Sequence, residues 1–356
     1  MQRNVGNLIL AAVAALLLAA CAGTPDSPDN ASRWSPARHQ AALAEARLLP
    51  APAAFEIRYL EWVDSDRQRE VLAKLYLPPA ATGPNPAPLV VFSHGLGGSR
   101  EGYSYLGANW AAHGYASLHI QHAGSDNRLW RGNPLEIVSR LQSAASEAEA
   151  VARVRDLRFA LDQVFAVPGL GNRLDPGRIV AAGHSYGANT VLLAAGAVFE
   201  RQQGKQSYVE PRLAGAVLIS APPFHGEADT DAIVGPIGIP TLHITATGDD
   251  IRLPGYQSGY EDRVRVFSAI GSLRKALVVF RDGAHSMFTD RLAPGGHDLN
   301  VQVKAATRDL SLAFFDEVLG GRPGAFGERS GNHGELISRL ESSLGQAPAV
   351  LVPRVF

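Results

Sequence analysis

Short, continuously apolar runs alternate with helix-length segments through the middle of this 356-residue chain, and this alternation limits its possible folds more than any other feature. Helical patterns lie between the runs, notably at Ser143–Phe165 and Ala188–Phe199. Buried strands that alternate with helices predict a mostly parallel sheet with helices on both faces. No internal repeat is evident, so we expect one domain over residues 53–320. The apolar runs are Leu89–Phe92, Ala116–Ile120, Arg178–Ala182, Ala216–Ser220, Pro240–Thr245 and Ala276–Phe280.

An antiparallel hairpin is predicted ahead of this sheet. Ile57–Val63 and Val71–Leu77 have the character of strands, and the polar turn Asp64–Arg67 joins them. Apolar residues recur at every second position of the second segment, so we expect one face of the hairpin to be largely solvated. The stretch Ala221–Ile239 is short for a lid, which predicts a fold with no large lid domain.

The C-terminal residues 321–356 follow the last predicted strand and its helix. A helix is predicted over Glu335–Leu344, and the chain ends in an apolar run, Ala349–Phe356. We expect this extension to pack on the edge of the domain.

The first residues have the pattern of an export signal. Arg3 gives a positively charged start, and Leu8–Ala20 is an apolar run too short to span a bilayer as an ordinary helix. We therefore predict that residues 1–20 form a signal peptide, which takes no part in the fold.

The end of that run, Leu18-Ala19-Ala20-Cys21, resembles a bacterial lipoprotein signal. The resemblance implies cleavage before Cys21, whose thiol would carry diacylglycerol and whose amine would carry an acyl chain such as palmitate. Several acyl chains on one residue anchor a protein stably to a membrane. Residues 21–52, rich in Pro, Ser, Asp and Ala, are predicted to be the tether. Ala22, in place of Asp, implies the outer membrane of the bacterial cell envelope.

The segment that carries most chemical information is Gly183-His184-Ser185-Tyr186-Gly187. It follows the apolar run ending at Ala182 and leads directly into a helical pattern, which is the context of a nucleophile elbow. The turn is so tight that side chains in place of Gly183 and Gly187 would clash, while Ser185 is exposed at its apex. This pattern predicts Ser185 as a nucleophile; the alternative is a turn serine that caps a helix.

A serine nucleophile needs a base, and the base needs a carboxylate that orients it. The chain order expected for this arrangement is Ser, then Asp or Glu, then His. Two acids, Asp249 and Asp250, follow the run Pro240–Thr245, and His285 follows the next run. All of them are expected at one edge of the sheet, where the carboxyl ends of parallel strands meet.

The developing oxyanion needs backbone N–H donors. The first is expected to be the N–H of Tyr186, directly after the nucleophile. The run Leu89–Phe92 leads into Ser93-His94-Gly95-Leu96-Gly97-Gly98, which is like the loop that supplies the second donor in esterases. Leu96 is the favoured second donor, with Gly97 as the alternative.

Taken together, these stretches resemble the α/β-hydrolase superfamily, and within it the dienelactone-hydrolase-like, platelet-activating-factor-acetylhydrolase-like and cutinase-type esterases. The resemblance covers Phe55–Leu319 and favours Asp249 over Asp250 as the triad acid. Dienelactone hydrolases proper use a cysteine where this chain has Ser185, so their reaction is not implied. The residues that carry the resemblance are Phe92–Tyr103, Gln121–Asp126, Gly183–Gly187, Asp249–Asp250 and His285.

The resemblance implies hydrolysis of carboxylic esters through an acyl-enzyme, with no metal and no organic cofactor. His122, Phe224 and His225 follow strand ends and are expected to line the cleft. Small-molecule or lipid esters with short to medium acyl groups are the expected substrates. Charged residues nearly balance, with a formal net charge of −1, so no nucleic-acid partner is expected.

Two alternatives from other functional classes remain open. One is a serine peptidase of the prolyl-peptidase type, which shares this kind of triad but carries an accessory propeller domain. The other is a non-catalytic surface lipoprotein built on a hydrolase scaffold; the presence of all three triad residue types and of the glycine-rich loop speaks against it.

Overall fold

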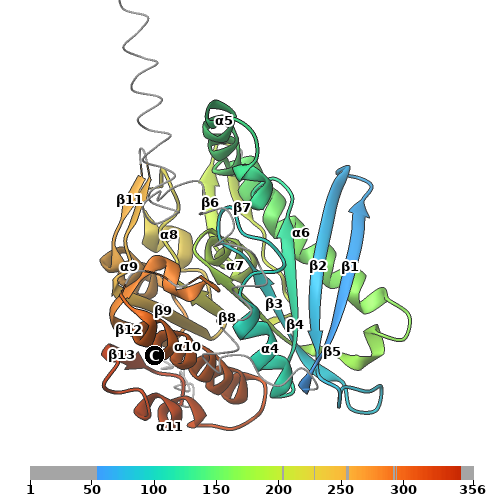
Figure 1. Ribbon diagram of the computed structural model, residues 1–356, viewed down its shortest axis with the longest axis vertical. Helices are drawn as coiled ribbons and strands as arrows, with labels where there is room; N and C mark the ends of the chain where they lie inside the picture. Colours follow the sequence, from blue (N-terminus) through green and yellow to red (C-terminus); the bar gives the residue numbers. More distant parts are fainter. Residues whose placement is uncertain are drawn as a thin grey trace, which may run out of the picture.

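The computed structural model describes residues 54–345, apart from residues 203, 228, 254, 255, 292 and 294, and it centres on a nine-stranded sheet (Figure 1). Its strand order is β1-β2-β4-β3-β5-β8-β9-β12-β13. Neighbours from β4 to β12 pair in parallel, whereas β1, β2 and β13 pair antiparallel. The predicted parallel sheet with an antiparallel N-terminal hairpin is confirmed. The strands are β1 (Glu56–Asp64), β2 (Arg69–Leu77), β3 (Ala87–Ser93), β4 (Ala116–His122), β5 (Leu174–His184), β8 (Leu213–Ile219), β9 (Thr241–Gly248), β12 (Lys275–Ala284) and β13 (Ile337–Ser342).

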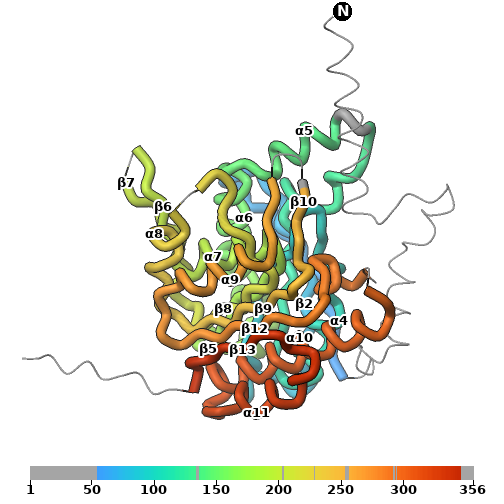
Figure 2. Tube along the Cα trace, turned by 90° about the vertical axis from the view of Figure 1, so that its left-hand side faces the viewer, coloured from blue at the N-terminus to red at the C-terminus, as the bar shows by residue number. Residues whose placement is uncertain are grey.

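Helices cover both faces of this sheet, as predicted (Figures 1 and 2). One face carries α6 (Glu147–Ala166), α7 (Tyr186–Ala195), α8 (Thr230–Val234) and α9 (Tyr260–Ala269). The opposite face carries α4 (Ser104–Ala112), α10 (His297–Val318) and α11 (Ala325–Gly331). The sheet is thus the middle of three layers, which is why its central strands are apolar on both sides.

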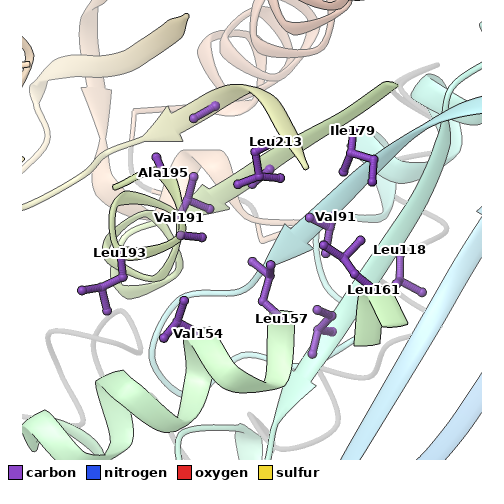
Figure 3. Packing of buried hydrophobic residues seen from close by; sticks show 14 of the residues in the cluster. Val91, Leu118, Val154, Leu157, Leu161, Ile179, Val191, Leu193, Ala195 and Leu213 are labelled. Carbon is purple, nitrogen blue, oxygen red and sulfur yellow. The ribbon is translucent and has the colours of Figure 1, made fainter. Parts of the chain in front are cut away.

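The core on the α6 face shows how sequence spacing becomes packing. Val154, Leu157 and Leu161 recur at helical spacing on α6, and all three are wholly buried. Figure 3 shows them beside Val91 of β3 and Leu118 of β4. Each buried side chain of this size contributes about 1.5–3 kcal/mol to the free energy of unfolding, so α6 is held firmly against the sheet.

Short elements rise at one end of the molecule, the top of Figure 1. They are insertions between the strands and core helices, and none is longer than 11 residues. The described part of the chain therefore has no large lid domain. Besides α8, these elements are the 3-10 turn η2 (Asn127–Trp130), α5 (Pro134–Ala144), β6 (Val198–Arg201), β7 (Gly204–Ser207), β10 (Ile251–Leu253) and β11 (Tyr256–Ser258).

Three sequence predictions about single elements are wrong. Instead of a helix over Glu335–Leu344, the chain forms β13, which adds to the open edge of β12. The solvated face expected for the hairpin is exposed only on β1, because α4 covers β2 and buries Lys74 and Tyr76. In addition, α7 ends at Ala195, four residues earlier than predicted, because Gly196 adopts a left-handed conformation.

The signal peptide, Cys21, the tether and the final apolar run 349–356 lie outside the described residues. Within the described residues, no helix has the length and apolar character needed to cross a bilayer. The predictions made for these segments therefore rest on the sequence alone.

Candidate active site

Ser185 lies at a sharp turn between β5 and α7, with φ of 55° and ψ of −123°. This is a costly conformation for a residue with a side chain, and the surrounding contacts impose it. A Cβ added to Gly183 would lie 2.4 Å from the carbonyl oxygen of Gly187, and one added to Gly187 would lie 1.9 Å from that of Ser93. The turn therefore requires both glycines, as the sequence predicts for a nucleophile elbow.

The hydroxyl of Ser185 faces His285, on a 3-10 turn, η4 (His285–Phe288), directly after β12. Ser185 Oγ lies 3.0 Å from His285 Nε2, and His285 Nδ1 lies 2.7 Å from Asp249 Oδ1. Because Nδ1 faces a carboxylate, it carries the ring proton, which leaves Nε2 free to accept the hydroxyl proton of Ser185. We call Ser185, His285 and Asp249 the rim triad.

Asp249 is fully buried and accepts several hydrogen bonds. Ser220 Oγ donates to its Oδ1 at 2.9 Å and also lies 2.8 Å from His285 Nδ1, while Thr245 Oγ1 donates to Oδ2 at 2.7 Å. Arg263 Nη2 lies 3.6 Å from Oδ1. Burial alone would raise the pKa of Asp249, but His285, Arg263 and the Ser220 hydroxyl hold that pKa well below its usual value. Asp249 is therefore ionised at neutral pH.

Asp250, the alternative acid, points elsewhere. Its side chain is 46% exposed, and its Oδ2 accepts a hydrogen bond from Arg252 Nη2 at 2.8 Å. Of the two neighbouring acids, Asp249 alone contacts His285 among the described residues.

Two backbone N–H groups are unused, one directly after Ser185 and one in the glycine-rich loop that packs against the elbow. Among the described residues, neither the N–H of Tyr186 nor that of Leu96 has a hydrogen-bond acceptor. The N–H of Gly97 donates to the carbonyl of Ser125 at 2.9 Å, so Gly97 is not free to serve as an oxyanion donor. Trp130 covers the same loop, and its Nε1 donates to the carbonyl of Gly97 at 3.0 Å. The loop thus presents Leu96 as its open donor.

A chain of hydrogen bonds joins this loop to the loop of His285. Tyr103 Oη lies 3.3 Å from the Gly95 nitrogen, from which it accepts, and 2.8 Å from His184 Nδ1. His184 Nε2 lies 3.1 Å from the carbonyl oxygen of His285, which can only accept. His184 Nε2 therefore carries the ring proton, and Tyr103 donates to Nδ1. His184, the residue before the nucleophile, thus helps to hold the loop that carries the base His285.

His122 does not line a cleft, and that prediction is wrong. The side chain is fully buried behind the glycine-rich loop, and both of its ring nitrogens are engaged. Nε2 lies 2.9 Å from Ser93 Oγ, and Nδ1 lies 3.1 Å from Asp156 Oδ2. We call Ser93, His122 and Asp156 the buried triad.

Phe224 and His225 follow β8 and lie near the insertions of the rim. The Phe224 ring is partly buried, with its centroid 5.0 Å from that of Phe199 on β6. His225 is exposed, with its ring 5.4 Å from that of Tyr256 on β11. Both side chains are accessible to solvent, so their expected place in the cleft stays a prediction.

Several residues of the site escaped the sequence analysis. Ser220 directly follows β8, so a search for polar residues at strand ends would have found it, whereas Thr245 lies within β9 and carries no such signal. Arg263 lies in mid-helix on α9, among charged neighbours, and nothing in the sequence marks it as buried.

Comparison with known proteins finds similarity to proteins that are named as hydrolases. The model of the family described as platelet-activating factor acetylhydrolase, isoform II, matches residues 76–128, which include the glycine-rich loop. Platelet-activating factor acetylhydrolases of Cavia porcellus and Canis lupus familiaris are 29% and 30% identical over 140 and 139 residues. Each match covers 30% of this chain and 31% of the relative, so the chain matches less than a third of those relatives' length.

Among solved structures, a ferulic acid esterase from Streptomyces cinnamoneus superposes with a TM-score of 0.55 at 24% identity. The superposition covers 77% of this chain and 93% of that one, so the similarity of fold extends over most of the domain. The molecule therefore has the α/β-hydrolase fold, and over about a third of its length its sequence is similar to platelet-activating factor acetylhydrolases.

Proposed function

We propose that this protein is a serine esterase that hydrolyses carboxylic esters through the rim triad. Ser185 Oγ attacks the ester carbonyl while His285 Nε2 takes its proton, and Asp249 stabilises the resulting imidazolium. The N–H groups of Leu96 and Tyr186 hold the oxyanion. His285 then protonates the leaving alcohol, and a water molecule repeats the sequence to release the acid.

One observation carries this proposal: Ser185 Oγ lies 3.0 Å from an imidazole whose other nitrogen is held by a buried carboxylate. The unused N–H groups beside it supply what the transition state needs. Because the relatives are named acetylhydrolases, we favour esters of short acyl groups as substrates. This agrees with the short to medium acyl groups expected from the sequence.

The test uses the full-length chain in detergent with p-nitrophenyl acetate, p-nitrophenyl butyrate and a prolyl p-nitroanilide. We expect hydrolysis of both esters, and a loss of at least about 10³-fold in kcat for Ser185→Ala. Equal rates for the two proteins would refute the proposal, and preferential cleavage of the anilide would favour a peptidase. A fluorophosphonate label on a serine other than Ser185 would assign the nucleophile elsewhere.

We also propose that a lipidated Cys21 anchors the enzyme to the cell envelope, with the outer membrane as its destination. The sequence around Cys21 is the support for this proposal. We expect a clickable palmitate analogue to label the wild-type chain in cells but not Cys21→Ala, which should leave the membrane fraction. Labelling that persists in Cys21→Ala would refute the anchor.

A further inference from the structure

Arg153 is a fully buried arginine on α6, on the interior side of the glycine-rich loop. Each of its three nitrogens donates a hydrogen bond, yet none of these bonds goes to a carboxylate among the described residues. A buried guanidinium without a direct counter-ion is costly. The hydrogen-bond partners of Arg153 should therefore indicate its role.

We propose that Arg153 is the positioning residue of the oxyanion hole, which holds the two backbone donors at a fixed separation and supplies positive potential behind them. This proposal rests on the proposed function, because it assigns a role within the same reaction. Arg153 forms no hydrogen bond with Ser185 or His285, so its effect passes through the two donor segments.

The first donor segment is the loop that contains Leu96. Arg153 Nη2 donates to Ser93 Oγ at 3.0 Å and to the carbonyl oxygen of His94, at the start of the loop. Nη1 donates to Ser125 Oγ at 2.7 Å, and the carbonyl of Ser125 accepts the N–H of Gly97 at 2.9 Å. Arg153 thus fixes the loop on both sides of Leu96.

The second donor segment is the first turn of α7. Arg153 Nε donates to Thr190 Oγ1 at 2.8 Å, and Thr190 Oγ1 donates in turn to the carbonyl of Tyr186 at 3.2 Å. The guanidinium also lies over the Tyr186 ring, 4.5 Å from its centroid. A cation over an aromatic face is attracted by the ring, and more strongly where water is excluded. The guanidinium of Arg153 is therefore hydrogen-bonded to both segments that carry the proposed oxyanion donors.

The charge of Arg153 is retained. Burial lowers its pKa to about 10, so the guanidinium is still protonated at neutral pH. Burial and the charge of Arg153 lower the pKa of His94, which keeps that ring neutral. The nearest carboxylates act through intermediaries: Ser125 Oγ donates to Glu149 at 2.8 Å, and Ser93 reaches Asp156 through His122. The positive potential is thus incompletely neutralised behind the oxyanion donors, where it favours developing negative charge.

A thionoester provides a readout that a merely structural role would not change. Sulfur at the oxyanion position is larger than oxygen and accepts hydrogen bonds weakly, so an intact hole discriminates strongly against the C=S substrate. We expect Arg153→Met to lower kcat for the oxygen ester about 10–100-fold with little change in KM. The ratio of the oxygen-ester rate to the thionoester rate should fall about tenfold, and Arg153→Lys should recover part of it.

The matched control is Leu161→Ala, two turns along the same helix, which opens a core cavity away from the loop and lowers the thermal midpoint. We expect Leu161→Ala to keep the wild-type rate ratio. The proposal is overturned if Arg153→Met, or Arg153→Lys should the methionine variant not fold, keeps the wild-type ratio. Absence of ester hydrolysis by the wild type would instead refute the proposed function.

Discussion

The rim triad and the buried triad have nearly the same hydrogen-bond geometry in opposite surroundings. The serine-to-histidine distances are 3.0 Å at the rim and 2.9 Å in the interior, and the histidine-to-aspartate distances are 2.7 Å and 3.1 Å. The side chain of His285 is 24% exposed, whereas that of His122 is fully buried. A serine, a histidine and an aspartate in line are therefore not enough to identify a catalytic centre.

What separates the two sets is which atoms remain free. In the buried triad, Ser93 Oγ already accepts from Arg153, and Asp156 accepts from Arg67 and Arg69. At the rim, Ser185 lies in a strained turn, and the N–H groups of Tyr186 and of Leu96 in the adjoining loop have no acceptor among the described residues. A serine that is accessible to solvent and has free N–H donors nearby can act as a nucleophile. A buried serine whose hydrogen bonds are all satisfied has a structural role.

The largest expected effects come from the two histidines. We expect His285→Ala to lower kcat for p-nitrophenyl acetate by at least about 10³-fold, with little change in the thermal midpoint. His122→Asn should lower the free energy of unfolding by about 1–3 kcal/mol and kcat less than tenfold. Steady-state kinetics and urea unfolding measure both quantities. Comparable losses of activity in the two variants would erase the proposed distinction between the triads.

The two neighbouring acids should differ from each other in the same way. Asp249→Asn keeps the shape of the side chain but removes the carboxylate that fixes the His285 tautomer, so kcat should fall about 10³–10⁴-fold. Asp250→Asn changes an exposed side chain paired with Arg252 and should change kcat less than twofold. Burst kinetics with the acetate ester will show whether acylation is the step that slows. A larger loss of kcat in Asp250→Asn than in Asp249→Asn would identify Asp250 as the triad acid.

Local patterns account for what the sequence predicts well. The elbow around Ser185 is contained within a few consecutive residues, and each central strand is a short, mostly apolar run, so neither signal depends on distant partners. The failures involve long-range pairing. Leu336, Leu340 and Leu344 are spaced as in a helix, yet the open edge of β12 draws this segment into a strand.

His122 illustrates the same limit within the site. Its position at the end of an apolar run predicts a strand end but not the face on which the ring lies. That face is decided by Ser93 and Asp156, which are 29 and 34 residues away. The burial of Arg153 is equally hard to predict, because α6 carries several other charged residues and nothing in the sequence sets this arginine apart from them.

A fully buried histidine such as His122 should make the free energy of unfolding, rather than kcat, depend on pH. Within the described residues five histidines are buried, and burial lowers the pKa of each, to about 3 for two of them, His119 and His243. As pH falls below about 6.5, the unfolded chain binds protons that the folded chain cannot, so stability decreases. The five are His94, His119, His122, His184 and His243.

His243 provides the smallest and most isolated test of this effect. It lies on β9 and belongs to neither triad, with Phe267 against its ring and Lys275 as the charge that adds to burial in lowering its pKa. Its Nε2 has no hydrogen-bond partner in the part of the chain that the structure describes, so His243→Leu should be tolerated. Urea unfolding at pH 7.5 and 5.5 should show the variant losing about 1.4 kcal/mol less stability than the wild type. Equal losses of stability in the variant and the wild type would mean that His243 is protonated in the folded protein. That result would contradict the prediction.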